Sequence, residues 1–163
     1  MLEFITEAVV LDRVDSGELD SRVYLYTQDL GKISAKVKSV RKITSKLAGH
    51  LQPLNKIMAR IIDKNGPQLI DALTIKNNPK TTASLKALFF IKELAVEGQP
   101  DSELWHFLEN ENDLNSKTIL SFLGFDPAFA KCHYCQKAGP ENFYPADYAF
   151  YCGPCSPTGS YRV

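Results

Sequence analysis

The residues best suited to chemistry are the four cysteines, which lie near the end of the chain as two Cys-x-x-Cys pairs. The sequence reads Cys132-His-Tyr-Cys135 and, after a gap of sixteen residues, Cys152-Gly-Pro-Cys155. Two such pairs at a spacing of about 15–20 residues are typical of a site in which four thiolates surround one zinc ion. The spacing therefore predicts a structural Zn²⁺ site with Cys132, Cys135, Cys152 and Cys155 as its ligands.

Two other interpretations of these cysteines stay open. Two disulfides would need an oxidising compartment, and unpaired thiols could serve redox chemistry. The first residues, Met1-Leu-Glu-Phe-Ile-Thr-Glu7, lack the cationic segment that opens a signal peptide. We therefore expect reduced cysteines and a metal. A closed site of four cysteines leaves no position for water, so it would stabilise the fold without catalysing a reaction.

No other group of residues forms a recognisable catalytic set. The sequence has no GxxxxGK[ST] phosphate loop, no GxGxxG and no HExxH. Glu18 and Asp20 are two neighbouring carboxylates, but they lie in a turn-rich segment near Arg22, which is more typical of a solvated loop than of a nuclease site. The three histidines, His50, His106 and His133, are scattered. We predict that the chain is not an enzyme and has no small-molecule substrate.

Length and composition indicate a globular protein of one large or two small domains. The chain has 163 residues, of which 44% are hydrophobic. No apolar run approaches the ~20 residues of a membrane-spanning helix, so no membrane partner is expected. The net charge is zero, yet residues 1–78 carry twelve Lys/Arg against nine Asp/Glu, whereas residues 79–163 carry seven against ten. The charge is therefore divided between a basic and an acidic half.

Five segments of the first half show the residue types and alternation of β-strands. Asn65-Gly66 indicates a hairpin between the last two of them. Five short strands with a long connection after the third suit a small barrel of the OB-fold type, although a sandwich or an open sheet would also fit. The predicted strands cover residues 4–12, 22–28, 32–38, 55–63 and 68–76.

Three short helices are predicted after residue 78. The first covers residues 82–97 and ends before Gly98; the second begins at Asp101 or Ser102, and the third at Asp113 or Asn115. The aromatic residues between the cysteine pairs should form the buried side of a zinc ribbon. They are Phe143, Tyr144, Tyr148, Phe150 and Tyr151. The fold class is therefore predicted as α+β, with an OB-fold barrel over residues 1–78 and a small helical domain with the zinc site over residues 79–163.

A basic segment follows the second predicted strand. Between residues 32 and 46 there are six cations and no carboxylate, namely Lys32, Lys36, Lys38, Arg41, Lys42 and Lys46. Strand alternation places the first three on one face. This face could bind nucleic acid, or it could be a solvated cationic edge that prevents aggregation. Tyr24 and Tyr26 could stack on bases, although tyrosines in such strands more often pack in a half-buried layer.

Several segments carry a resemblance to a known family. They read Glu7-Ala-Val-Val-Leu11, Gly17-Glu-Leu-Asp20-Ser-Arg22, Leu25-Tyr-Thr27, Gly31-Lys-Ile-Ser-Ala35, Lys38-Ser-Val-Arg41, Ser45-Lys-Leu-Ala-Gly49-His-Leu-Gln-Pro53 and Leu123-Gly-Phe125-x-Pro127. In order and spacing they make the chain similar, over most of its length, to the bacterial RecO recombination mediators.

This resemblance implies an N-terminal OB-fold, a helical domain and a zinc site. It implies binding to single- and double-stranded DNA and annealing of complementary strands during recombinational DNA repair. It also implies RecR and the single-strand-binding protein as partners, so that RecA can load on single-stranded DNA, and a cytoplasmic location at the bacterial nucleoid. The basic residues that match are Lys32, Lys36, Lys38, Arg41 and Lys46.

Two features depart from the family pattern. Ser39 stands where many members have glycine, and the chain ends at Val163 although typical members continue with further helices. We therefore expect a short or truncated member. The leading hypothesis is a non-enzymatic DNA-binding and annealing factor. The alternative is a zinc-ribbon adaptor that binds other proteins, with lysines that only keep it soluble.

Overall fold

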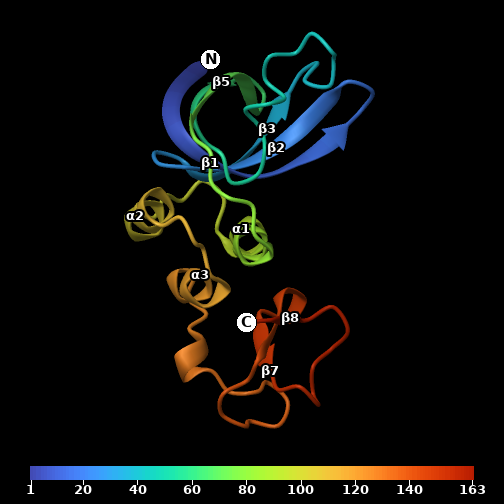
Figure 1. The fold of residues 1–163 in the computed structure, drawn as a ribbon, viewed down its shortest axis with the longest axis vertical. Coiled ribbons are helices and arrows are strands. Elements are labelled where there is room, and N and C mark those ends of the chain that lie inside the picture. Colours follow the sequence, from blue (N-terminus) through green and yellow to red (C-terminus); the bar gives the residue numbers. More distant parts are fainter.

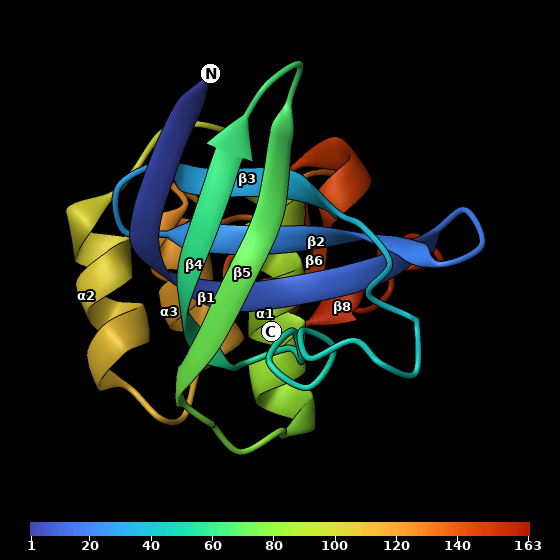
Figure 2. The ribbon, with the colours of Figure 1, turned by 90° about the horizontal axis from the view of Figure 1, so that it is seen from above.

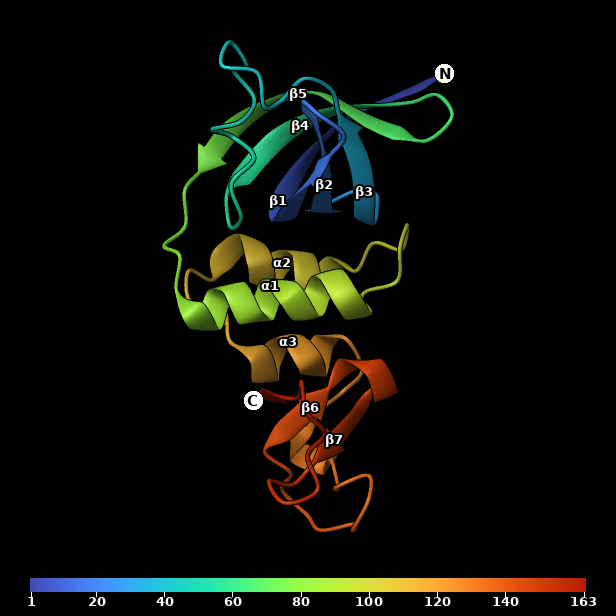
Figure 3. The same cartoon turned by 90° about the vertical axis from the view of Figure 1, so that its right-hand side faces the viewer.

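The computed structural model describes all residues from 1 to 163 and shows three layers along the long axis of the molecule (Figure 1). A β-barrel occupies one end, three α-helices lie in the middle, and a small three-stranded sheet occupies the other end, near the C-terminus. Figure 3 shows the same order from the side, with α1 and α2 directly under the barrel and α3 between them and the sheet.

The barrel consists of five strands, β1 (Leu2–Ser16), β2 (Asp20–Thr27), β3 (Gly31–Val37), β4 (Lys56–Asp63) and β5 (Pro67–Lys76). It closes in the order β1-β2-β3-β5-β4, and β4 pairs again with β1 (Figure 2). Neighbouring strands are antiparallel except β3 and β5, which run parallel and share the single registered pair Lys36 and Gln68. The predicted five-stranded OB-fold barrel is confirmed, and the sandwich and open-sheet alternatives are excluded.

The interior of the barrel is an apolar core of its own. Alternate residues of each strand point inward because successive side chains of a strand face opposite sides. On β3 these are Ile33, Ala35 and Val37, all buried, as predicted from the alternation with lysines. Val40 and Leu51, from the long loop between β3 and β4, are also buried in this core, so that loop is anchored at both ends.

The three helices are α1 (Thr82–Leu94), α2 (Ser102–Asn110) and α3 (Ser116–Phe122). Each begins at a side chain that accepts hydrogen bonds from the first turn. These N-cap residues are Thr81, Asp101 and Asn115, so Asp101 and Asn115 are confirmed among the predicted candidates. None of the helices is long and apolar enough to cross a membrane.

Helix α1 ends earlier than predicted. The chain leaves the helix at Ala95 in an extended conformation, and Gly98 lies beyond it in the connection to α2. The reason is a competing interaction with the barrel, since Gly98 N–H donates to the carbonyl of Lys32 (2.9 Å) and Glu97 forms a β-bridge with the same residue. The residues expected to extend the helix instead bind the edge of β3.

A second apolar core joins the three layers. It contains Val9, Leu11 and Tyr26 from the outer face of the barrel, the inner faces of the helices, and Phe143 and Phe150 from the small sheet. Phe90 of α1 is central, with its ring edge-on to Phe143 at 5.6 Å between centroids. Because this core draws residues from both halves of the chain, the division at residue 78 stays a prediction.

The small sheet is formed by β6 (Asn142–Tyr144), β7 (Ala149–Tyr151) and β8 (Tyr161–Arg162) in the order β7-β6-β8. Two 3₁₀ turns flank it, η1 (Pro127–Phe129) and η2 (Pro145–Asp147). The buried aromatic side predicted for this segment is correct for Phe143, Phe150 and Tyr151, but it is wrong for Tyr148, which is 62% exposed. Tyr148 ends the tight turn after η2 with φ 52°, so its side chain leaves the sheet.

Candidate metal centre and nucleic-acid interface

The sulfur atoms of Cys132, Cys135, Cys152 and Cys155 all lie within 4.8 Å of one another. The sulfurs of Cys135 and Cys152 are 3.7 Å apart. Four thiolates at about 2.3 Å from a tetrahedral zinc ion have sulfur–sulfur separations of about 3.8 Å. A disulfide would require about 2.05 Å, and all four cysteines are free. The predicted cluster is therefore present and is compatible with a metal site.

Backbone hydrogen bonds hold the first cysteine pair in a closed loop. Cys132 N–H donates to the carbonyl of Lys137, and Gln136 N–H donates to the carbonyl of Cys132, both at 2.9 Å. Gln136 takes the left-handed conformation, with φ 62°, which returns the chain past the cysteines. His133 N–H donates to the carbonyl of Phe150 (2.8 Å), two residues before Cys152. That bond fixes the first pair against the strand that leads into the second.

The electrostatics of the cluster suit a cation at its centre. Burial of Cys132 raises the pKa of its thiol, but backbone N–H groups of Cys135, Cys152 and Tyr134 outweigh burial and lower this pKa to about 6. The pKa of Cys155 is raised to about 12, first by its hydrogen bond with Cys152 and then by burial. Four neighbouring thiols cannot all ionise without a positive charge between them. The donor set therefore fits a thiolate-bound metal.

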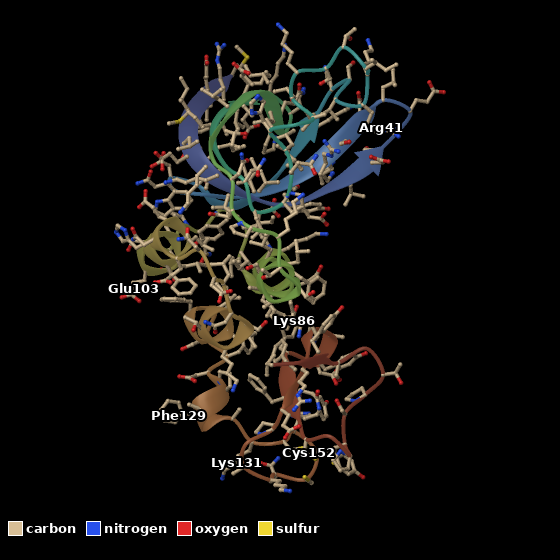
Figure 4. The ribbon with its side chains drawn as sticks, viewed as in Figure 1. Arg41, Lys86, Glu103, Phe129, Lys131 and Cys152 are labelled. Carbon is tan, nitrogen blue, oxygen red and sulfur yellow. The ribbon has the colours of Figure 1, made fainter.

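The basic residues of the loop after β3 lie at the opposite end of the molecule. Figure 4 labels Arg41 beside the β1–β2 hairpin and Cys152 at the far end of the ribbon. Lys38, Lys42 and Lys46 are exposed, and their ammonium groups form no ion pair or hydrogen bond. These three cations are available to an anionic ligand.

Two further cations of the predicted set connect this loop to the β1–β2 hairpin. Lys36 pairs with Asp20 (3.2 Å), and Arg41 pairs with Asp15 (3.3 Å) and donates to the carbonyl of Gly17. In each pair one side chain is about half or more exposed and the other is about one-third exposed, so water partly screens both pairs and their cations can exchange partners. The five cations from Lys36 to Lys46 therefore lie together around the end of β3.

Ser39 fixes the path of the loop after β3. Its φ is 54°, a left-handed conformation that glycine adopts at lower cost. Its N–H donates to the carboxylate of Asp20 (2.7 Å). This bond, together with the bond from Lys36, lowers the pKa of Asp20. The side chain of Asp20 thus ties β2 to both the end of β3 and the loop.

Lys32 is separated from the other cations. Its ammonium group donates to the carbonyl of Lys92 (2.7 Å) in the last turn of α1, and burial lowers its pKa. A cation at this position compensates the negative end of the helix dipole. Although strand alternation places Lys32 on the outer face, as predicted, α1 covers that part of the face. A DNA contact by Lys32 would require it to leave the helix.

The two tyrosines of β2 are packing residues. Tyr26 is buried, and its hydroxyl accepts a hydrogen bond from Asp101 N–H (3.0 Å). The ring of Tyr24 lies under the ammonium group of Lys92, 4.4 Å from its centroid. Both tyrosines therefore have the packing role that was expected to be the more common one, and neither ring is free to stack on a base.

Arg22 is a cation that sequence reasoning did not include in the site. It lies opposite Lys36 in the register of β2 and β3, is exposed, and donates to Ser34 (3.2 Å). The alternation of β2 already placed Arg22 on the outer face, so the signal was present in the sequence. Arg22 was not included because the basic segment was defined from Lys32 to Lys46, which begins on the following strand, β3.

The chain is a protein of the OB-fold class, in which a closed five-stranded barrel is joined through three helices to a four-cysteine ribbon. The barrel carries the exposed cations, and the ribbon carries the cysteine cluster. Comparison with known proteins finds similarity to one family. A family model described as "Recombination protein O N terminal" matches residues 1–78. The chain is thus similar to RecO proteins, over residues 1–78 in the family model and over most of its length in individual relatives.

Three relatives show how far this similarity extends. The DNA repair protein RecO of Thermodesulfovibrio yellowstonii is 29% identical, over 98% of this chain and 73% of the relative. The RecO of Myxococcus xanthus is 27% identical, over 95% of this chain and 73% of the relative. The RecO of Dehalococcoides mccartyi is 31% identical, over 83% of this chain and 62% of the relative. The similarity therefore includes the helices and most of the ribbon as well as the barrel.

Proposed function

We propose that the chain is a non-enzymatic factor of recombinational DNA repair that binds single- and double-stranded DNA and anneals complementary strands. The observation that carries the proposal is the group of unpaired, exposed lysines on the loop after β3, namely Lys38, Lys42 and Lys46. OB-folds bind oligonucleotides on the face of strands 2 and 3 and on adjacent loops. These lysines adjoin the part of that face that the helices leave uncovered.

The proposed DNA face consists of Arg22, Lys36, Lys38, Arg41, Lys42 and Lys46. Lys36 and Arg41 would exchange Asp20 and Asp15 for phosphates, which is inexpensive because exposed ion pairs are worth only ~0–1 kcal/mol. Lys32 is left out because its ammonium group is bound to α1. Lysines recognise phosphates as point charges, so binding should depend little on DNA sequence.

We further propose that the metal is zinc and that its role is structural. Four thiolate ligands at this spacing favour zinc over metals that prefer oxygen. The cysteines lie at the opposite end of the molecule from Arg41, so the metal would support the ribbon and helices and not the same DNA contact (Figure 4).

The similarity to RecO proteins supports the remaining parts of the proposal. A RecO protein would act with a RecR-like protein and with the single-strand-binding protein, so that RecA can load on single-stranded DNA, in the cytoplasm and at the bacterial nucleoid. The annotated relatives are named as DNA repair proteins, which supports the same process for this chain. A zinc-ribbon adaptor without direct DNA contact is the competing function.

The test is a salt titration of oligonucleotide binding. If four to six phosphates are contacted, log K against log salt on single strands should have a slope of roughly −3 to −4, at about −0.7 per phosphate. Replacing Lys38, Lys42 and Lys46 together by alanine should weaken binding to all sequences and make the slope shallower by about two units. Because these side chains have no partners, their loss should leave the fold intact.

The matched control is a triple alanine variant of Lys117, Lys131 and Lys137. These lysines are equally exposed and unpaired, but they lie beyond the barrel, and Figure 4 labels Lys131 at the metal end. The control should bind DNA like the parent protein. Equal weakening in both variants would show that only net charge matters, and an unchanged slope in the first variant would favour the adaptor function.

A further inference from the structure

A cleft lined by aromatic rings lies where α1 meets the ribbon. It has a volume of about 330 Å³ and is lined by residues of the second half of α1, the end of β6, the η2 turn, and the segment that leads into β8. The η2 turn contacts α1, and Tyr161 of β8 packs against Phe89 of the same helix. The side chains that matter are Phe89, Glu93, Tyr144, Tyr148 and Tyr161. We call them the aromatic cleft.

The rings of this cleft come from α1, β6, the residue after η2 and β8, and Tyr148 also stacks on Phe125 outside the cleft. Phe89 and Tyr161 are 4.8 Å apart between centroids and tilted by 39°. Tyr144 lies against Gly159, which has φ 92° and brings the chain close to that ring. Tyr148 is exposed at the rim. Aromatic faces carry negative electrostatic potential and therefore attract cations.

Glu93 adds a carboxylate that has no partner within the chain. It is exposed and takes part in none of the ion pairs. The lysines of the same helix are occupied elsewhere, since Lys92 pairs with Asp12 (2.8 Å) and Lys86 donates to the carbonyl of Arg162 (2.9 Å). The cleft thus combines aromatic rings with a carboxylate that has no direct partner, although Lys32 and Lys92 lie near enough to interact with its charge.

We propose that the aromatic cleft binds the cationic side chain of a lysine or arginine from a protein partner. The rings would surround the cation while Glu93 pairs with it, as in the aromatic cages that recognise ammonium groups. A nucleic-acid base could also stack on these rings. However, Glu93 and the surplus of three negative charges in residues 79–163, seven cations against ten carboxylates, favour a cation and repel phosphates.

The test uses the full, zinc-loaded chain labelled with ¹⁵N and two pentapeptides that differ only in charge. Gly-Gly-Arg-Gly-Gly should shift the amide resonances of Ala146, Gly159 and Tyr161 in a saturable manner. The peptide with citrulline in place of arginine has nearly the same shape without the charge, and it should bind at least about fivefold more weakly, because cation–π attraction and pairing with Glu93 are both lost.

Two variants assign the effect to the cleft. Glu93→Gln keeps the shape of the side chain and should weaken the arginine peptide about threefold to tenfold, and Tyr161→Leu should weaken it by a similar factor. Glu103→Gln is the matched control, because Glu103 is also an exposed, unpaired glutamate and lies on α2, away from the cleft (Figure 4). Binding by this control should equal that of the parent.

The proposal is overturned by any of three results. The first is the absence of saturable shifts at these amides with the arginine peptide. The second is equal affinity for the arginine and citrulline peptides, which would leave charge without a role. The third is a stronger shift of the same resonances by an oligothymidylate than by the peptide, which would make the cleft a stacking platform for bases.

Discussion

At the scale of single residues, the cysteines show how the fold prepares ligands before a metal binds. Backbone N–H groups already stabilise the Cys132 thiolate, whose pKa is about 6, whereas the pKa of Cys155 is about 12. Metal binding must therefore displace a proton from Cys155 but finds Cys132 ionised at neutral pH. Ligation of this kind contributes directly to folding free energy.

The first prediction concerns Cys152→Ser. Because a serine hydroxyl is not ionised at neutral pH and is a poor zinc ligand, the variant should lose the metal that the parent retains at about one Zn²⁺ per chain. Elemental analysis of protein purified under reducing conditions measures this ratio. Ser156→Ala, a change beside the cluster that removes no sulfur, should keep the metal. A parent protein without zinc and with four titratable thiols would contradict the assignment.

At the scale of elements, the contact between β3 and α1 determines what Lys32 does. The prediction is that Lys32→Met lowers the free energy of unfolding by about 1 kcal/mol, since the carbonyl of Lys92 loses its donor and the helix end loses a compensating charge. Chemical denaturation measures the loss. DNA affinity should stay close to that of the parent.

The comparison variant is Lys36→Met, because Lys36 is exposed and its ion pair with Asp20 lies at the surface. It should weaken DNA binding and change stability by less than ~1 kcal/mol. If Lys32→Met instead weakens DNA binding as much as Lys36→Met does, Lys32 belongs to the DNA face and the capping role is secondary.

Gly31 is a second element-scale test, because the turn before β3 approaches the connection between α1 and α2. Its φ is 67°, and a Cβ atom would lie 2.7 Å from the backbone nitrogen of Pro100 and still closer to the carbonyl of Gln99. Gly31→Ala should therefore cost more than about 3 kcal/mol of unfolding free energy. Gly17→Ala, with φ 73° and nothing within 4 Å, should cost about 1 kcal/mol. Equal losses in the two variants would contradict the close packing.

The elements were predicted from sequence where local pattern decides them. The alternation around Ile33 and Val37 and the Asn65-Gly66 turn predicted the strands but left a sandwich or an open sheet open beside the barrel. The cysteine spacing was sufficient for the cluster. The failures arose where a distant contact competes with local preference. The residues after Leu94 bind β3 instead of continuing α1, and Lys32 binds a helix that is sixty residues away in sequence. The charge pattern of the sequence could not show that Lys32 binds α1 whereas Lys36 stays exposed at the surface.

At the scale of the whole molecule, one apolar core connects the barrel surface, the helices and the ribbon. Barrel and helices are also linked by Lys56, whose ammonium group pairs with Glu7 of β1 (2.8 Å) and Glu109 of α2 (2.9 Å). The interior of the barrel is a separate core. Loss of order in the ribbon should therefore spread to the helices before it reaches the barrel.

Metal removal tests this order. After chelation, amide hydrogen exchange should accelerate in residues 142–151 and in α1, because Phe143 and Phe150 no longer hold Phe90. The central amides of β1, β2 and β4 should stay protected. Uniform acceleration in all three layers would show a single cooperative unit, and no change in α1 would show that the ribbon folds independently of the helices.

The parallel contact between β3 and β5 is the shortest of the five junctions between neighbouring strands of the barrel. Every other junction is a ladder of several paired residues, whereas this one has the single pair Lys36 and Gln68. A barrel should open first at the junction that has the fewest paired residues, so local opening should begin between β3 and β5. Lys36 lies at that junction and also belongs to the proposed DNA face. A DNA strand bound across this junction would hold β3 and β5 together. DNA binding and closure of the barrel would therefore stabilise each other.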